Sequence, residues 1–471
     1  MPGPVRGVEG PRGGARGVAA LPGAAAPSLR GVTSLPPPSP VYRRPRMLSP
    51  LREHLRDTFW FAPVAAMAAI CVLWAACAGL DAEIVETLRD EGAYEAIGDL
   101  AGIAEDAKTV VTTVGSAMMT FIGVVFSISL VAVQMASGQF SPRVVRIFVR
   151  SRITKATLSV FLATFLLSLL VLTSYESETD PRLVTAVPLL QSILTLAMVG
   201  LSLLLFVAYV NATLRLMRVG HVVDRIARES FRVLAKTPWY EGGGDELGPV
   251  TGQVVHRGRA GVLRDVNVAR LVRVARRHGL VLRLLPRIGD FVVPGTPILA
   301  VHGGAVPKGL ASSVSVGIER TFHQDLGFGL RQLADIALRA LSPAVNDPTT
   351  AVQCLDRIVQ FLAAVAHRPL GAVAYRDGRG GDGAVRLVQD LPGWTDLVDL
   401  GFAEIRGCAE GSPQVSRRML AGLDDLLALV PEDRTEPLLR HRVLLTELVE
   451  RTVPQAADRA FALEADRQGI G

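Results

Sequence analysis

Four long runs of apolar residues dominate the first half of the chain. They lie at about 59–80, 110–136, 156–174 and 187–210. Each is close to the roughly 20 residues that a helix needs to cross a bilayer, and helices of soluble proteins are rarely so uniformly apolar. Aromatic residues, which favour membrane interfaces, stand near their ends at Phe59, Trp60, Phe61, Tyr175 and Tyr209. The pattern predicts a four-helix membrane domain over residues 47–240, which includes a connector after the fourth span.

Charged residues divide the loops around these spans into two classes. Arginines precede the first span, separate the second from the third and follow the fourth, as at Arg143, Arg146, Arg215 and Arg218. The other two loops are mainly acidic and include Asp81, Glu83, Glu86, Asp90, Glu176 and Glu178. Because Lys and Arg are in excess in cytoplasmic loops, we predict a multi-pass protein with both termini in the cytoplasm.

The N-terminal segment is of another kind. Residues 1–46 are rich in Pro, Gly and Arg and contain little apolar material, so we expect a disordered tail. Met47 is followed at once by a basic, amphipathic approach to the first span. We hypothesise that translation starts at Met47 and that the preceding tail is a mis-called extension.

After the membrane domain, the pattern changes to short strands and amphipathic helices. Residues 241–317 predict a small β-rich unit, with a strand at Thr251–Val255 and a helix that is capped by Asp265 or Asn267 and stopped by Gly279. The run "RIGDFVVPGTPILAV" resembles one half of a lipoyl- or biotinyl-type barrel-sandwich hybrid, but no carrier lysine is present. We therefore interpret it as a structural module.

Residues 318–471 are predicted to form a helical bundle, with a loop or small hairpin around 378–383. The predicted fold class is thus an α-helical integral membrane protein with four transmembrane helices and a cytoplasmic α+β region. That region comprises a small β-rich, barrel-sandwich-like unit followed by the helical bundle.

The second span differs from the others in its polar content. Ser116, Thr120, Gly123 and Ser127 follow i, i+4, i+7, i+11 spacing and share one helix face, which Gln134 extends. One interpretation is a packing seam, because small and hydroxyl residues allow close helix approach. The other is a polar path through the membrane. No ionisable residue lies inside the four predicted spans, which argues against a proton-coupled pump.

Two groups of charged residues are candidate contacts in the second half. Arg270, Arg273 and Arg277 share the outer face of a predicted helix, which predicts either a solvated face or contact with anionic lipid headgroups. Arg331, Asp335 and Arg339 are spaced i, i+4, i+8, as surface ion pairs would be.

The run "RALSPAVNDPTTAV", residues 339–352, is the candidate ligand or interdomain loop. Arg331, Asp335, Ser342, Asn346 and Asp347 are its candidate site residues. The structural interpretation is a helix–helix corner, with Asp347 as N-cap and Pro348 at the first helical position. That interpretation explains Asn346 least.

Catalytic and cofactor motifs are missing from the sequence. It has no P-loop, HExxH or GxSxG motif, and its four cysteines form no CxxC pair. We expect no metal and no cofactor. The net charge of +6 reflects the arginine-rich loops rather than nucleic-acid binding.

From Met47 onward the chain resembles the bacterial predicted membrane proteins known as domain of unknown function 2254. The motifs are "TFWFAP" (58–63), "GVVFSISLVAVQMASGQFSPRVVRIF" (123–148), "RIGDFVVPGTPILAV" (287–301) and "ERTFHQDLGFGLRQLADIALRALSPAVNDPTTAVQCLD" (319–356). The resemblance implies four membrane helices and a cytoplasmic C-terminal region in a bacterial inner membrane. It implies no activity and no catalytic residue.

Three functional hypotheses follow. The favoured one is a non-enzymatic channel-like, transport-like or sensory membrane protein, an oligomer whose cytoplasmic part binds a ligand or partner. The first alternative is a membrane-anchored scaffold that recruits a cytoplasmic partner. The second, less favoured, is a membrane-anchored enzyme that uses the Ser342–Asp347 loop.

Overall fold

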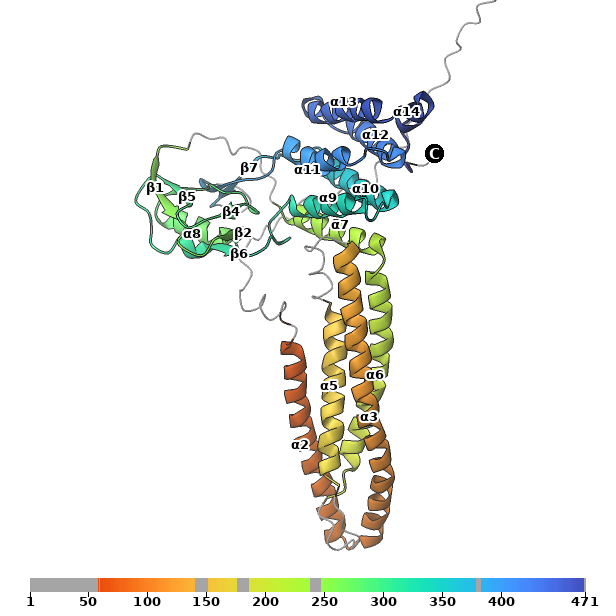
Figure 1. The fold of residues 1–471 in the computed structure, drawn as a ribbon. Helices are drawn as coiled ribbons and strands as arrows, with labels where there is room; N and C mark the ends of the chain where they lie inside the picture. Colours follow the sequence, from red (N-terminus) through yellow and green to blue (C-terminus); the bar gives the residue numbers. More distant parts are fainter. Residues whose placement is uncertain are drawn as a thin grey trace, which may run out of the picture. The chain divides into compact units, whose positions relative to one another are not determined.

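Four long helices form the first part of the protein (Figure 1). The computed structural model describes residues 58, 60–139, 151–175, 186–237, 247–377 and 383–469. The helices are α2 (Phe61–Asp90), α3 (Tyr94–Gln139), α5 (Arg152–Thr173) and α6 (Leu189–Leu216). Each is long and apolar enough to cross a membrane, as predicted. The N-terminal tail, Met47 and the arginines at 143–150 lie outside the described residues.

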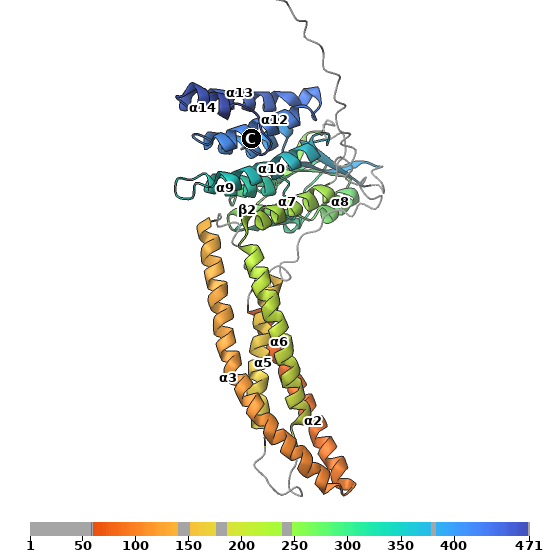
Figure 2. The same cartoon turned by 90° about the vertical axis from the view of Figure 1, so that its right-hand side faces the viewer.

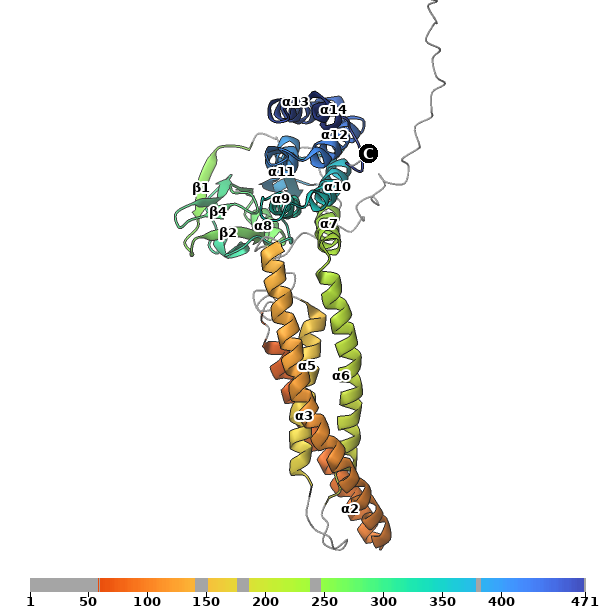
Figure 3. The same ribbon diagram turned by 45° about the vertical axis from the view of Figure 1, so that its right-hand side comes forward.

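Helix α5 is the centre of this bundle. It contacts α2, α3 and α6, and 44% of its apolar window is buried, against 11–17% for the other three helices. In Figure 3, α3 and α6 run along α5. Phe121, Phe161 and Phe206 join α3, α5 and α6, with ring centroids 5.5–6.4 Å apart. Most of the surface of α2, α3 and α6 is therefore left for lipid or another molecule.

A stack of helices forms another part of the chain (Figure 2). Its members are α7 (Val219–Lys236), α9 (Phe328–Ala340), α10 (Pro348–Val365), α11 (Trp394–Gly407), α12 (Pro413–Leu427), α13 (Thr435–Thr452) and α14 (Ala456–Ala462), with a 3-10 turn at Glu432–Arg434. Only Met217 and Arg218 separate α7 from α6. The connector after the fourth span is thus a helix of this stack.

Helix α7 is held by close and specific contacts. Its buried face packs on α9 and α10, Asp224 pairs with Arg357 at 3.2 Å, and Phe231 lies 6.0 Å from Phe361. At Gly329 the backbone of α9 comes so near to Ser230 that a Cβ there would overlap the hydroxyl. Glycine at 329 allows this approach.

The strands form two sheets beside one short helix. The five-stranded sheet has the order β1-β5-β3-β8-β7, and the three-stranded sheet has the order β4-β2-β6. The strands are β1 (Val250–Val255), β2 (Gly261–Val266), β3 (Val281–Leu284), β4 (Phe291–Val292), β5 (Pro297–His302), β6 (Val314–Gly317), β7 (Ala372–Arg376) and β8 (Val385–Asp390). Helix α8 (Val268–Arg277) and a 3-10 turn (Ala311–Ser313) complete this part.

A mixed α/β region therefore follows the four membrane helices, as predicted, but its finer description is not confirmed. The described strands close no barrel. Strand β8 pairs with β3 in parallel, Leu282 opposite Leu387, and β7 pairs with β8 as a hairpin. The loop or small hairpin predicted around 378–383 is thus flanked in sequence by two strands, β7 and β8, that join the sheet of the β-rich unit. Two local predictions are confirmed: Asn267, one of the two predicted caps, caps α8, and Gly279 follows the helix with φ 68°.

Residues 320–325 connect the sheets to the helical stack. The Gln324 side chain accepts from the Val266 N–H at 3.1 Å and donates to its carbonyl at 2.9 Å. Arg320 binds the buried Asp325 with two hydrogen bonds of 2.7 and 2.9 Å. A Cβ at Gly289 would come within 2.8 Å of that carboxylate, so the turn before β4 is closely packed against the segment that leads into α9.

The α7–α9 contact makes a first prediction. Gly329→Ala should destabilise the protein by about 1–3 kcal/mol, because the new methyl group overpacks the Ser230 contact. The measurement is the melting temperature in detergent. Adding Ser230→Gly should recover most of the loss. Equal stability of the wild type and Gly329→Ala would contradict the contact.

Candidate functional site

The polar face of α3 points away from the other three membrane helices. Ser116, Thr120, Gly123, Ser127 and Gln134 are all exposed. We call these five residues the α3 polar stripe. The opposite face carries the buried residues Val111, Gly115, Met118, Val125 and Ala132. Within one chain, the stripe is therefore not a seam between α3 and its own bundle.

Hydroxyl groups along this side of α3 bond mainly to their own helix. Thr112 donates to the Lys108 carbonyl at 2.8 Å, Thr113 to Thr109 at 2.8 Å, and Ser116 to Thr112 at 3.2 Å. Such bonds to the preceding turn satisfy the O–H donor. The hydroxyl oxygens keep acceptor capacity toward the outside.

Hydroxyl groups of the other helices are used differently. Thr164 of α5 bonds Ser202 of α6 at 3.1 Å, and Thr157 donates to the Leu205 carbonyl at 3.3 Å. Tyr209 of α6 bonds Ser129 of α3 at 2.7 Å and the Val125 carbonyl at 3.0 Å. Inside the bundle, polar groups thus join neighbouring helices, while the α3 polar stripe does not.

The sequence analysis missed a polar network at one end of the bundle. The charge pattern assigns Asp81 to an acidic loop, but Asp81 lies in α2 and is 1% exposed. Its carboxylate accepts from the backbone N–H of Leu190 at 2.9 Å and from the Gln191 side chain at 3.1 Å. Asp81 thereby supplies the N-terminal cap that α6 lacks at its own Pro188.

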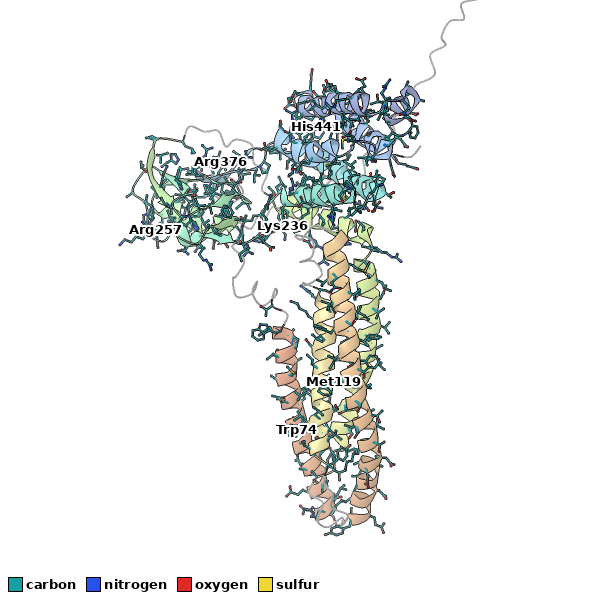
Figure 4. All side chains as sticks on the ribbon, viewed as in Figure 1. Trp74, Met119, Lys236, Arg257, Arg376 and His441 are labelled. Atoms are coloured by element: carbon teal, nitrogen blue, oxygen red, sulfur yellow. The ribbon has the colours of Figure 1, made fainter. Side chains whose placement is uncertain are left out.

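This network continues to a third helix. Gln191 accepts from the Ser174 hydroxyl at 2.8 Å, and Ser174 accepts from the indole of Trp74 at 3.3 Å. Figure 4 labels Trp74 on α2. The bonds link α2, α6 and the end of α5. A sequence signal existed, because a helix that starts at Val187-Pro188 has no capping side chain of its own.

The 342–347 loop has the structure of a helix corner. Asp347 accepts from the Thr350 N–H at 3.0 Å and the Thr350 hydroxyl at 2.5 Å, and Pro348 opens α10. Ser342 donates to the Arg339 carbonyl at 2.7 Å. Asn346 has φ 47°, the one positive φ among the described non-glycine residues. Asn tolerates this region better than most residues, which explains the residue that the sequence left least explained.

Arg331 and Asp335 belong to an ion-pair group between α9 and α11. Arg331 pairs with Asp335 at 2.7 Å and binds Glu404 through two hydrogen bonds of 2.7 and 2.8 Å. The hydrogen bonds from Arg331 hold the pKa of the Glu404 carboxyl below its ordinary value. These charges satisfy one another, whereas Ser342 bonds Arg339 and Asp347 bonds Thr350 within the corner.

The arginines of α8 lie on its solvent side. Arg270, Arg273 and Arg277 are exposed, while Leu271, Val272 and Ala275 are buried. Arg270 also donates to the Gly309 carbonyl at 3.2 Å. Headgroup contact by these arginines stays a prediction.

A hollow of about 590 Å³ opens beside the start of α11. Its lining includes Arg287, Asp396, Trp394 and Arg434. Arg287 pairs with Asp396 at 2.7 Å, and Arg434 donates to the carbonyls of Val365, Ala366 and Arg368. The charged side chains of Arg287, Asp396 and Arg434 are therefore already bonded within the protein. Among the described residues, no group of three or more His, Cys, Asp or Glu side chains could hold a metal ion.

Comparison with known proteins agrees with this architecture. The model of the family described as "Predicted membrane protein (DUF2254)" matches residues 56–425. The chain belongs to this family. The match includes the four membrane helices, both sheets and α7 to α11, and it ends within α12.

This DUF2254 protein is similar to mycobacterial proteins that carry no functional name. Uncharacterized proteins of Mycobacterium bovis and Mycobacterium tuberculosis are 28% identical over 386 aligned residues, which cover 78% of this chain and 71% of each relative. No solved structure matches the chain significantly.

Asp81 provides a test of the bundle. Asp81→Ala should lower the free energy of unfolding by about 2 kcal/mol or more, because it leaves buried N–H groups of α6 without an acceptor. Asp81→Asn, which keeps one acceptor oxygen, should cost less. Thermal unfolding in detergent measures this, with the exposed Asp90→Ala as control. Equal melting of the Asp81 and Asp90 variants would refute the cap.

Asp347 provides a test of the corner. Asp347→Ala should cost about 1 kcal/mol of stability, as loss of an N-cap does, while Asp347→Ser should retain most of it. Melting temperatures and any cellular phenotype should change together across the two variants. A stable Asp347→Ser protein that has lost the phenotype would instead indicate a chemical role for the carboxylate.

Proposed function

We propose that this protein is a non-enzymatic membrane assembly in which copies meet at α3, and that their polar stripes line a passive path for water and small ions. The single observation that carries the proposal is the exposure of the α3 polar stripe on a helix of membrane-crossing length. We also propose that the protein lies in the bacterial inner membrane with both termini in the cytoplasm. The arginine-rich loops support this orientation.

The first support is the cost of the stripe in lipid. A polar group without a partner in hydrocarbon costs several kcal/mol. The amide of Gln134 is exposed and, unlike a hydroxyl, has two N–H donors and a carbonyl to satisfy. Contact with a second copy or with water removes that cost.

The second support is the length of the stripe. Ser116 and Gln134 are 18 residues apart, so the stripe rises about 27 Å along the helix, close to the ~30 Å hydrocarbon core. Glu105 and Thr109, also exposed, continue the same face toward the acidic loop. Polar side chains recur on this face, interrupted at Gly123 and around Leu130 and Val131, over a distance that exceeds what a local packing contact needs.

The third support concerns the kind of transport. Between Val110 and Met135, α3 contains no ionisable side chain, so the stripe offers no relay for protons. Outward hydroxyl oxygens can replace part of the hydration shell of an ion or bind water. Passive conduction fits these groups better than pumping does.

The helical stack offers a route for control. Since α7 follows α6 after two residues and packs on α9 and α10, a ligand or partner that shifts the stack would act on α6. We propose this as the role of the cytoplasmic part.

Cysteine crosslinking tests the assembly. In a variant with Cys71, Cys77 and Cys408 replaced by Ala, Ser127→Cys should form disulfide-linked dimers in native membranes. Cys354 can stay, because it is buried. Leu204→Cys on α6, which is 72% exposed, is the matched control and should stay monomeric. The assembly is wrong if both positions crosslink equally or neither does.

Ion flux into liposomes tests the path. Thr120→Leu with Ser127→Leu should keep the protein folded but slow the flux about tenfold or more, since about 1.4 kcal/mol of added barrier has that effect. Val124→Leu, beside the stripe, should leave flux unchanged. Crosslinking at Ser127 without any wild-type flux would overturn the path and leave an assembly joined through α3.

A further inference from the structure

The β-rich part has a net charge far above that of the rest of the chain. Residues 247–317 contain ten basic and two acidic residues, a net charge of +8, whereas the whole chain has +6. Six of the basic residues are exposed and have no ion pair to another described residue: Arg257, Arg259, Arg273, Arg276, Arg277 and Lys308. The charge is therefore directed to the surface.

One corner of this part also exposes large apolar side chains. Phe291 is 67% exposed and Val293 is 49% exposed, while Val292 between them is buried. The next residues form a tight turn, with Pro294 at its second position and Gly295 at φ 96° in the third. The Thr296 N–H donates to the Val293 carbonyl at 3.0 Å and closes the turn. We call Phe291, Val293 and Pro294 the apolar tip.

The loop between β1 and β2 lies beside the apolar tip, because both ends of this loop are bonded to residues 292–296. The His256 N–H donates to the Thr296 carbonyl at 2.8 Å, and the Gly295 N–H donates to the His256 carbonyl at 2.9 Å. Gly261 of β2 pairs with Val292. The loop between these attachments holds Arg257 and Arg259, both exposed; Figure 4 labels Arg257 on the β-rich part.

The geometry points to a membrane-docking surface: the apolar tip inserts into the headgroup region of an anionic bilayer while Arg257 and Arg259 bind lipid phosphates. An apolar tip flanked by basic residues has the chemistry of an anionic interface, where apolar burial and charge attraction act together. The chain's four candidate spans would hold this part near a bilayer, which raises the effective concentration of that surface.

This inference differs from the headgroup contact predicted for α8. Arg270, Arg273 and Arg277 lie on a helix whose other face is buried in the sheet core, and they have no exposed apolar neighbour on α8. These arginines would attract anionic headgroups electrostatically without inserting. The apolar tip, on β4 and the following turn, is the part that inserts into the bilayer. The inference stands apart from the proposed path through α3.

Photocrosslinking in the full-length protein tests the docking. Benzoylphenylalanine at position 291 should form lipid adducts in nanodiscs that contain phosphatidylglycerol, and few in purely zwitterionic nanodiscs. The same group at Leu439 on α13, 48% exposed, is the control and should give few adducts in either. Roughly 1 M salt, with a screening length near 3 Å, should reduce the yield at 291.

Charge removal separates lipid binding from mere exposure. Arg257→Ser with Arg259→Ser should lower the docking equilibrium constant about 25-fold, at about fivefold per basic residue, with the melting temperature in detergent unchanged. Inorganic phosphate at millimolar concentration should not compete. Equal adducts at 291 and 439, no adducts in anionic nanodiscs, or adducts mainly to protein or nucleic acid would each overturn the inference.

Discussion

In the membrane part, the structure depends on one constraint: a polar group in a bilayer needs a partner. The central helix α5 meets it through contacts such as Thr164–Ser202, and Asp81 meets it by capping α6 across the bundle. These bonds hold four helices whose apolar surfaces offer one another little advantage over lipid. On the α3 polar stripe, Ser116 bonds only within its own helix and the Gln134 amide is exposed, and we therefore propose α3 as the functional face.

The connections outside the bundle are short and tightly packed. Gly329 lets α9 approach Ser230 of α7, and α7 follows α6 directly. Just before α9 in the chain, Asp325 with Arg320 packs against the turn at Gly289, and Gln324 bonds the end of β2. Packed contacts of this kind change between discrete arrangements more readily than they stretch. We propose that these contacts couple the sheets, the stack and α6.

Local chemistry was readable from the sequence, and distant partners were not. The caps at Asn267 and Asp347 and the four apolar helices follow from residues within a few positions of each other. Asp81 finds its partners more than 100 residues away, and β8 pairs with β3 across a similar distance. The i, i+4 spacing showed that Ser116 and Thr120 share a face, but spacing alone does not tell what that face meets. The φ of Asn346 likewise became clear only in the fold.

The most direct test of the central claim is a distance between copies. A single spin label at position 127, in the cysteine-replaced protein in lipid nanodiscs, should give an intermolecular dipolar signal. The account predicts a separation within about two helix diameters, roughly 20 Å, and a longer one for a label at 204. A protein that carries the label at 127 and shows no intermolecular signal would contradict the assembly at α3.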